Sequence, residues 1–269
     1  MSSDPLRSCL AASGTLGWRQ DRIKARHDGE GMSQRDAQLQ DYLHAFWGYG
    51  NLDADYWLVG LEEGGAADWG EVCAHLDRWE HHGRAPVIPL RPPPEQLDGH
   101  RWFGEKPRIQ PYWAKLSRMM LAAEGGVPST EAARWYQARR LAAPEGVSCL
   151  LELLPLPAQS TDQWLYGEHC GLDVLVSRST YKAEIVPSRI EELSKMIQRY
   201  RPRCVVFFGT SYRAHWNEVA GTTLPEWRSP PLAIPGSDTV AVTATHPAAV
   251  GVTNAYFDDL GDALPAPRG

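Results

Sequence analysis

Four short apolar segments along the chain are typical of strands buried on both faces of a sheet. They lie at residues 56–59, 148–157, 204–209 and 239–244. Apolar residues at helical spacing fall between them, at about 33–47, 69–82, 111–124, 129–141, 187–200, 212–219 and 253–260. Strands that alternate with helices favour a parallel sheet with right-handed crossovers. We therefore expect an α/β fold in which a single domain holds a central four-stranded parallel sheet flanked by helices.

Three further segments lack a regular pattern. Residues 1–31 are polar and poorly periodic, so we expect an N-terminal arm ahead of one domain at 32–269. Residues 84–110 contain six prolines and end in a basic stretch that includes Arg108. A loop this long in a compact domain is usually functional or disordered. Residues 163–181 are also expected to be irregular.

The composition narrows the class of protein. A formal net charge of −6 argues against a protein that coats nucleic acid non-specifically, although a DNA enzyme needs only a local basic face. Eleven tryptophans and ten tyrosines would suit stacking on bases or sugars. Five scattered cysteines without a CxxC pair, no secretory signal and no long apolar run lead us to expect a cytoplasmic monomer without membrane contact, metal or cofactor.

Acidic residues follow or interrupt two of the expected strands. Glu62 and Glu63 come directly after the first strand, between Gly60 and Gly64. In an open parallel sheet the carboxyl ends of the strands are where ligands bind, although a turn that merely solvates two acids has the same pattern. Glu152 lies inside an apolar run, where glutamate is rare without a partner. It is therefore either a site residue or half of a buried ion pair with an arginine.

The other two strands also end in polar residues. Gly209, Thr210 and Ser211 lead from the third strand into a helix, and backbone amides with two hydroxyls suit a phosphate there. His246 follows the fourth strand; a lone histidine in that place is more often structural than catalytic. Four loops at the carboxyl ends of parallel strands converge on one edge of the sheet, and this convergence favours a functional site.

The order of these motifs resembles that of the uracil-DNA glycosylase superfamily, over about residues 55–264. Residues 60–64 (Gly-Leu-Glu-Glu-Gly) resemble the family motif Gly-x-(Asp/Asn)-Pro-Gly. The remaining matches are 150–152 (Leu-Leu-Glu) for the strand that ends near a base-reading asparagine, 207–209 (Phe-Phe-Gly), and 246–248 (His-Pro-Ala) for His-Pro-Ser.

The resemblance implies catalytic roles. Glu62 would place or activate the hydrolytic water, with Glu63 standing where the family has proline. A carboxylate suits this chemistry because cleavage of an N-glycosidic bond develops positive charge on the sugar. His246 would stabilise negative charge on the departing base. No lysine lies in the motifs, so the resemblance implies a monofunctional hydrolase that leaves an abasic site.

The resemblance also implies binding roles. The base would be flipped out of the stack and held by Gly60, Leu61, Glu152 and Trp69, although Trp69 is an equally credible core residue. Pro247, Ala248 and Ala249 resemble the loop that enters the minor groove, without the family's serine at Ala248. Gly209, Thr210, Ser211 and Arg108 are the remaining candidate DNA contacts.

Glu152 is the informative departure from the family. An ionised glutamate only accepts hydrogen bonds, which suits the exocyclic amine of cytosine better than uracil. Excision of ordinary cytosine would destroy the host genome, so we favour a modified (hydroxymethylated or glucosylated) cytosine of phage DNA and a role in antiviral defence. A protonated Glu152 could donate to a carbonyl, which would restore a uracil-excising repair enzyme.

Two readings of other classes stay open. One is a non-catalytic module of the same fold that binds a damaged or flipped base. The other is an unrelated α/β hydrolase or transferase acting on a nucleotide or sugar. The latter is disfavoured because the sequence has no Gly-x-Ser-x-Gly elbow, Walker loop or Gly-x-Gly-x-x-Gly after a strand.

Overall fold

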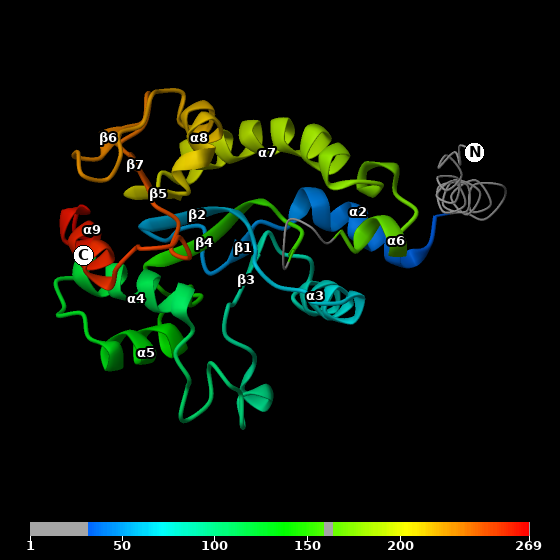
Figure 1. The fold of residues 1–269 in the computed structure, drawn as a ribbon, viewed down its shortest axis with the longest axis horizontal. Helices are drawn as coiled ribbons and strands as arrows, with labels where there is room; N and C mark the ends of the chain where they lie inside the picture. Colours follow the sequence, from blue (N-terminus) through cyan, green and yellow to red (C-terminus); the bar gives the residue numbers. More distant parts are fainter. Residues whose placement is uncertain (1–31, 159–163, 269) are drawn as a thin grey trace, which may run out of the picture.

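A computed structural model describes residues 32–158 and 164–268, so the expected arm at 1–31 lies outside the described residues. Within these ranges the chain forms a single α/β domain around a seven-stranded, mostly parallel sheet (Figure 1). The strand order is β3-β1-β4-β2-β5-β7-β6. The strands are β1 (Gly48–Tyr49), β2 (Tyr56–Glu62), β3 (Val87–Ile88), β4 (Ser148–Leu154), β5 (Cys204–Phe208), β6 (Leu232–Ala233) and β7 (Val240–Ala244).

The four expected strands are present as β2, β4, β5 and β7, and they form the contiguous parallel centre of the sheet. The expected number of strands is wrong, because the described residues add three at the edges. β1 runs antiparallel to β4 and parallel to β3, while β6 runs antiparallel to β7. Each added strand has only two residues. Two residues are too few to show a strand period in the sequence.

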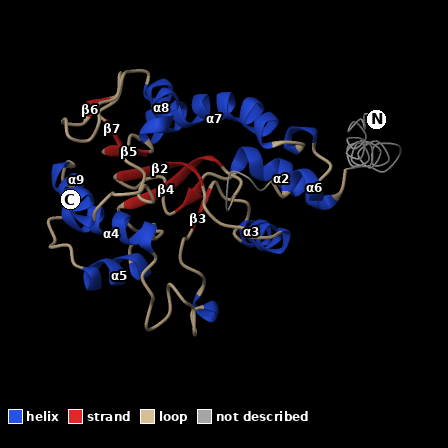
Figure 2. Cartoon of the chain, viewed as in Figure 1, coloured by secondary structure: helices blue, strands red, loops and turns tan. Residues whose placement is uncertain are grey.

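Helices cover both faces of the sheet (Figure 2). In β2, Trp57 and Val59 pack into one core and Tyr56 and Leu58 into the other, as alternating side chains of a central strand must. The helices are α2 (Gln34–Ala45), α3 (Trp69–His81), α4 (Pro111–Ala123), α5 (Thr130–Arg139), α6 (Tyr166–His169), α7 (Arg178–Tyr200), α8 (Arg213–Ala220) and α9 (Asn254–Ala263), with 3-10 turns η1 (Pro94–Gln96), η2 (Asp173–Leu175) and η3 (Thr210–Tyr212). No helix of the described ranges is long and apolar enough to cross a membrane.

Most helix starts follow from capping residues in the sequence. Ser33 caps α2 by accepting from the amide of Asp36, and Ser129 and Thr253 cap α5 and α9 in the same way. The expected start of α7 at residue 187 is wrong. The helix begins at Arg178, capped by Ser177, and Pro187 lies inside it. Proline is normally found at the start of a helix or outside it, so the sequence pattern places the start of this helix too late. Arg178 therefore lies on a helix and not in the irregular segment that we expected.

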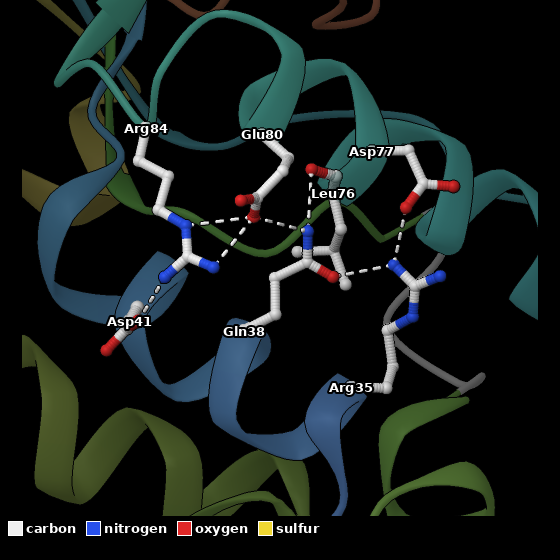
Figure 3. A network of polar contacts seen from close by, with 7 residues as sticks. All are labelled: Arg35, Gln38, Asp41, Leu76, Asp77, Glu80 and Arg84. Carbon is white, nitrogen blue, oxygen red and sulfur yellow. Dashed lines mark hydrogen bonds and ion pairs between the residues drawn. The ribbon is translucent and has the colours of Figure 1, made fainter.

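A polar network joins α2 to α3 (Figure 3). Gln38 donates to the carbonyl of Leu76 at 3.1 Å and to Glu80 at 3.2 Å. Arg35 pairs with Asp77 at 2.7 Å. A cavity of about 320 Å³ lies along this seam, lined by Gln34, Arg35, Gln38, Asp77, Glu80 and Arg84. The arginines of this network are paired with carboxylates, and Arg84 pairs with both Asp41 and Glu80. We therefore interpret the network as a structural contact that holds α2 against α3.

Candidate active site

Three glutamates gather at the carboxyl ends of the two central strands, and we call Glu62, Glu63 and Glu152 the acid cluster. The parallel register sets Gly60 of β2 beside Glu152 of β4, and Glu62 beside Leu154. The charges of Glu63 and Glu62 both raise the pKa of Glu152, after burial, which is the largest cause. The sheet therefore brings together the acids that the sequence places about ninety residues apart.

Gly60 makes room for the carboxyl group of Glu152. A β-carbon at Gly60 would stand 2.3 Å from Glu152 Oε2 and 2.9 Å from Cδ. Oε2 is buried and has no hydrogen-bond partner among the described residues. Burial and the two neighbouring acids hold the pKa of Glu152 well above its usual range, and Arg189 opposes them only in part. This environment favours the neutral carboxyl group.

Arg189 of α7 is the arginine beside Glu152, but the two side chains form no ion pair. The residue is 2% exposed, and its guanidinium donates to the backbone carbonyls of Leu153, Phe46 and Glu152, each at 2.9 Å. Burial lowers the pKa of Arg189 to about 9. The structure therefore does not show the buried ion pair between Glu152 and an arginine. Arg189 instead binds the backbone around Glu152, and it makes no hydrogen bond to the Glu152 carboxyl group.

Glu63 is held by a buried tyrosine. The hydroxyl of Tyr49 donates to Glu63 Oε1 at 2.8 Å and to Oε2 at 3.0 Å. Burial, followed by the charge of Glu63, raises the pKa of Tyr49 well above its usual range, so the phenol keeps its proton. His75 Nδ1 lies 3.9 Å from Glu63 Oε2, and the guanidinium of Arg78 lies 5.6 Å from the Tyr49 ring.

Glu62 is held on one side only. Oε2 pairs with Arg178 of α7, and the two side chains are 10% and 15% exposed. Oε1 is buried without a hydrogen-bond partner in the part of the chain that the structure describes. Burial raises the pKa of Glu62, while Arg178 and Lys182 lower it. One oxygen is thus fixed by a cation, and the other has a free capacity to accept a hydrogen bond within the described ranges.

His246 lies directly after β7. Its Nδ1 accepts a hydrogen bond from the amide of Ala248 at 3.1 Å, so a neutral ring carries its proton on Nε2. Burial, followed by the charge of Lys115, lowers the pKa of His246. Lys115 Nζ also donates to the carbonyl of Pro247 at 2.6 Å. The structure therefore presents a neutral imidazole with a donor, on a loop tied to α4.

Tyr112 of α4 contacts the ring of His246 and lies within electrostatic range of two members of the acid cluster. The rings of Tyr112 and His246 have centroids 5.5 Å apart. Burial, followed by the charges of Glu152 and Glu63, raises the pKa of Tyr112 well above its usual range. The candidate catalytic residues Glu62, Glu63 and His246 therefore belong to one edge of the sheet, as the topology predicts.

The loop after His246 ends in an exposed apolar tip. The amide of Ala249 donates to the carbonyl of His246 at 2.9 Å and closes a turn. Ala248 is exposed, Pro247 is buried, and Val250 is fully exposed at 105%. Single exposed apolar side chains are common on protein surfaces, so the exposure of Val250 gains meaning only from its place on the loop after His246.

Trp69 is the first residue of α3 and is partly buried. Its ring stacks on His169, with centroids 4.9 Å apart, and meets Tyr166 edge-on at 5.9 Å. Tyr166 lies near the acids, because Glu62 and Glu63 contribute to raising its pKa after burial and Tyr181. Trp69 thus borders the site, with His169 over one face of its ring. Leu61, the remaining candidate on β2, is partly buried against the cores.

The other DNA-binding candidates lie apart from the acid cluster. Gly209 has a φ of 95°, and its amide donates to the carbonyl of Ala244 at 2.9 Å, so it is occupied within the sheet and not open to an anion. Thr210 and Ser211 form part of η3 with exposed side chains. Arg108 is exposed on the loop before α4. No recorded contact joins these described residues to the acids.

Several site residues could not be found from the sequence. Tyr49 belongs to a two-residue strand, Arg178 to a helix turn hidden by Pro187, and Tyr112 and Lys115 to a helix whose sequence shows only an apolar pattern. None has a motif. Across residues 32–158 and 164–268, no group of three or more histidines, cysteines or acids is arranged to hold a metal ion.

Comparison with protein-family models and with curated proteins found no match to the chain. The fold and the site together define an α/β protein with a carboxyl-rich site at the carboxyl edge of a parallel sheet. Three residues belong to this edge of the sheet. They are Glu62, which has one oxygen paired with Arg178, the buried Glu152, and His246, whose neutral form is favoured.

Proposed function

We propose that this protein is a DNA glycosylase that hydrolyses the N-glycosidic bond of a flipped pyrimidine and leaves an abasic site. The observation that carries the proposal is the presence of Glu62 and His246 at the same edge of the sheet. Glu62 Oε1 has no hydrogen-bond partner among the described residues, and the neutral form of His246 is favoured. The four contiguous parallel strands with helices on both faces also agree with the resemblance to the uracil-DNA glycosylase superfamily.

In this reaction Glu62 acts on the water and the sugar. The bond between C1′ and the base nitrogen breaks, its electron pair goes to the base, and the sugar develops oxocarbenium character. The ionised Glu62 stabilises that charge, and Oε1 accepts a proton from the water as its oxygen bonds to C1′. Arg178 supports the role, because its charge opposes the effect of burial and favours the ionised carboxylate.

His246 acts on the departing base. Its Nε2–H donates to the base oxygen on which negative charge develops, and Nδ1 is fixed by the Ala248 amide. A neutral imidazole is a suitable donor here because it need not lose a full charge to the base. The proton that Glu62 takes from water finally returns to the base nitrogen, so the enzyme is unchanged after turnover. No lysine of the motifs takes part, and the reaction is monofunctional.

The loop that carries Val250 supplies the contact with the duplex. An apolar side chain at an exposed tip can wedge between base steps and hold the vacated position open. Pro247 and Ala249 stabilise the turn beneath it. Ala248 offers no hydroxyl to a phosphate, so backbone contacts are left to the loop itself and to the exposed side chains of Thr210, Ser211 and Arg108.

Glu152 reads the base. We favour a modified cytosine of phage DNA, and thus antiviral defence by a monomeric cytoplasmic enzyme, because excision of ordinary cytosine would be lethal to the host. The alternative is uracil excision in repair. It is favoured by one observation, the environment that promotes the neutral form of Glu152, since a protonated carboxyl group can donate to the uracil carbonyl.

The test uses purified protein and DNAs that carry uracil, cytosine, hydroxymethylcytosine or its glucosylated form. Abasic sites are scored by alkaline cleavage, with Glu62→Ala and Glu152→Ala in parallel. Cleavage of modified-cytosine DNA alone, lost in both variants, supports the favoured target. Cleavage at uracil makes the protein a repair enzyme. Binding of these DNAs without abasic sites would instead indicate a non-catalytic module, and activity on free nucleosides but not on DNA a nucleoside hydrolase.

A further inference from the structure

Glu63 has no role in the mechanism above, although it is the best-anchored member of the acid cluster. Both of its oxygens accept from Tyr49, at 2.8 and 3.0 Å, and its backbone carbonyl accepts from the amide of Ala158 at 3.0 Å. Tyr49 itself is 6% exposed and lies under the cation of Arg78. Residues of the sheet and of α3 therefore hold the Glu63 carboxylate in place.

Glu152 is the opposite case. Its Oε2 is buried against Gly60 and has no hydrogen-bond partner within the described ranges. Strand β4 lies between β1 and β2 in the sheet, so the hydrogen bond from Tyr49 to Glu63 spans the strand that carries Glu152. The negative charge of Glu63 therefore opposes the ionisation of Glu152. The hydroxyl of Tyr49 donates its proton to the Glu63 carboxylate, whereas no hydrogen bond among the described residues reaches Oε2 of Glu152. The proton is therefore expected on Glu152.

The groups around Glu152 on each neighbouring element also favour its protonated form. The groups that interact with it electrostatically are Tyr49 of β1, Glu62 and Glu63 at the end of β2, Tyr112 of α4 and Arg189 of α7. The tyrosines are neutral and the glutamates are acidic. Arg189 is the only cation of this set, and its guanidinium is engaged by three backbone carbonyls. Burial is therefore the first cause of the raised pKa of Glu152, and among the charged groups Glu63 adds most to it.

We propose that Glu63, anchored by Tyr49, is a positioning residue that keeps Glu152 protonated, so that Glu152 reads the edge of a pyrimidine with one donor and one acceptor. The inference rests on the proposed function for what Glu152 reads, but the location of the proton is a property of the chain alone. Glu63 touches neither water nor base and acts only through Glu152.

A neutral carboxyl group matches both atoms of a pyrimidine edge. With cytosine its hydroxyl donates to N3 and its carbonyl oxygen accepts from the 4-amino group; with uracil the hydroxyl donates to O4 and the carbonyl oxygen accepts from N3–H. An ionised carboxylate makes only one of the two bonds in either case. A substituent at C5 leaves these atoms unchanged, so the substrate class is a pyrimidine with an unblocked N3 and 4-position.

The test is a pH titration of glutamate carboxyl carbons by NMR in protein labelled with ¹³C at Cδ, with the Glu152 signal assigned from Glu152→Gln. In the unaltered protein we expect a midpoint well above that of an ordinary glutamate. Glu63→Gln and Tyr49→Phe should each lower the midpoint, by about one unit or more in Glu63→Gln. Tyr136→Phe is the matched control, because Tyr136 donates to Glu124 in a tyrosine–glutamate pair at another place.

An unchanged midpoint in Glu63→Gln and Tyr49→Phe would overturn the inference, as would an ordinary midpoint in the unaltered protein. The second experiment measures KM and kcat against pH with the DNA that the protein is found to act on. The loss of affinity at high pH should move to lower pH in Glu63→Gln and stay in place in Tyr136→Phe. A shifted NMR midpoint with no DNA cleavage would refute the glycosylase but not the role of Glu63; cleavage with an unshifted midpoint would do the reverse.

Discussion

The carboxyl group of Glu152 lies against the α-carbon of Gly60 on the neighbouring strand, where a β-carbon would stand 2.3 Å from Oε2. The contact follows from the register of two parallel strands that pair Gly60 with Glu152. A glycine is needed at this position for space, since its backbone is not in the left-handed region. The conformation of the Glu152 side chain thus depends on the absence of a single methyl group two residues before Glu62.

Gly60→Ala is expected to push the Glu152 carboxyl group aside and to slow base excision by about 100-fold, the cost typical of a displacement of about 1 Å at a reacting site. Single-turnover rates on the cleaved DNA measure it. Gly64→Ala is the control, because a β-carbon there meets nothing within 4 Å. In a Glu152→Ala background the Gly60 substitution should add nothing; a further loss would mean that it acts elsewhere.

Glu62→Gln is expected to lower the excision rate by roughly 10²- to 10⁴-fold, because the amide neither carries charge for the oxocarbenium ion nor accepts the proton of water. DNA binding, measured separately, should be retained. Glu191→Gln, an exposed position on α7, is the matched control. A rate within a few-fold of the unaltered protein would move the catalytic role to another carboxylate.

Glu152→Gln is expected to stabilise the protein increasingly as pH rises above about 4.5. The sign follows from the raised pKa of Glu152. Below the unfolded pKa both states are protonated; above it the unfolded chain ionises first, so the free energy of unfolding falls until the folded pKa is reached. Each unit of difference is worth about 1.4 kcal/mol. Urea denaturation between pH 4 and pH 8 measures the gap, and a constant gap would contradict the buried neutral carboxyl group.

Val250→Ala is expected to slow excision from duplex DNA by about tenfold or more while the rate on single strands is unchanged. The reason is that only the duplex must be unstacked and kept open, at a cost of about a few kcal/mol. Val127→Ala is a close control, since Val127 is 87% exposed on another loop. Equal effects on both kinds of DNA would show that Val250 contributes to something other than base flipping.

Lys115→Met is expected to raise the pKa of His246, because the charge of Lys115 lowers it. Activity that needs the neutral imidazole is lost as pH falls through that pKa, so the acidic limb of the pH–rate profile should move to higher pH. Lys195→Met, on the exposed face of α7, should leave the limb in place. An unmoved limb in Lys115→Met would assign the acidic limb to a different group.

The sequence was sufficient for the centre of the fold because β2, β4, β5 and β7 are continuous apolar runs, whose type follows from their pattern alone. The same runs led to Glu62, Glu152 and His246, since topology puts their ends at one edge. The contacts that set the chemistry of these residues could not be predicted. Arg178 and Glu62 lie 116 residues apart, and Tyr49 meets Glu63 from a strand of two residues. Such pairs depend on how helices and edge strands pack, which a local pattern does not record.

Strand β2 pairs with β4 and β5, both of which come much later in the chain. On the ribosome, residues 56–59 therefore emerge as an exposed apolar strand with no partner until the chain reaches residue 148. Apolar strands that wait in this way pair readily with other unfinished chains, and flanking charges oppose this. Glu62 and Glu63 stand at the end of that strand. The sequence therefore places two negative charges at the end of the segment that waits longest for its strand partners.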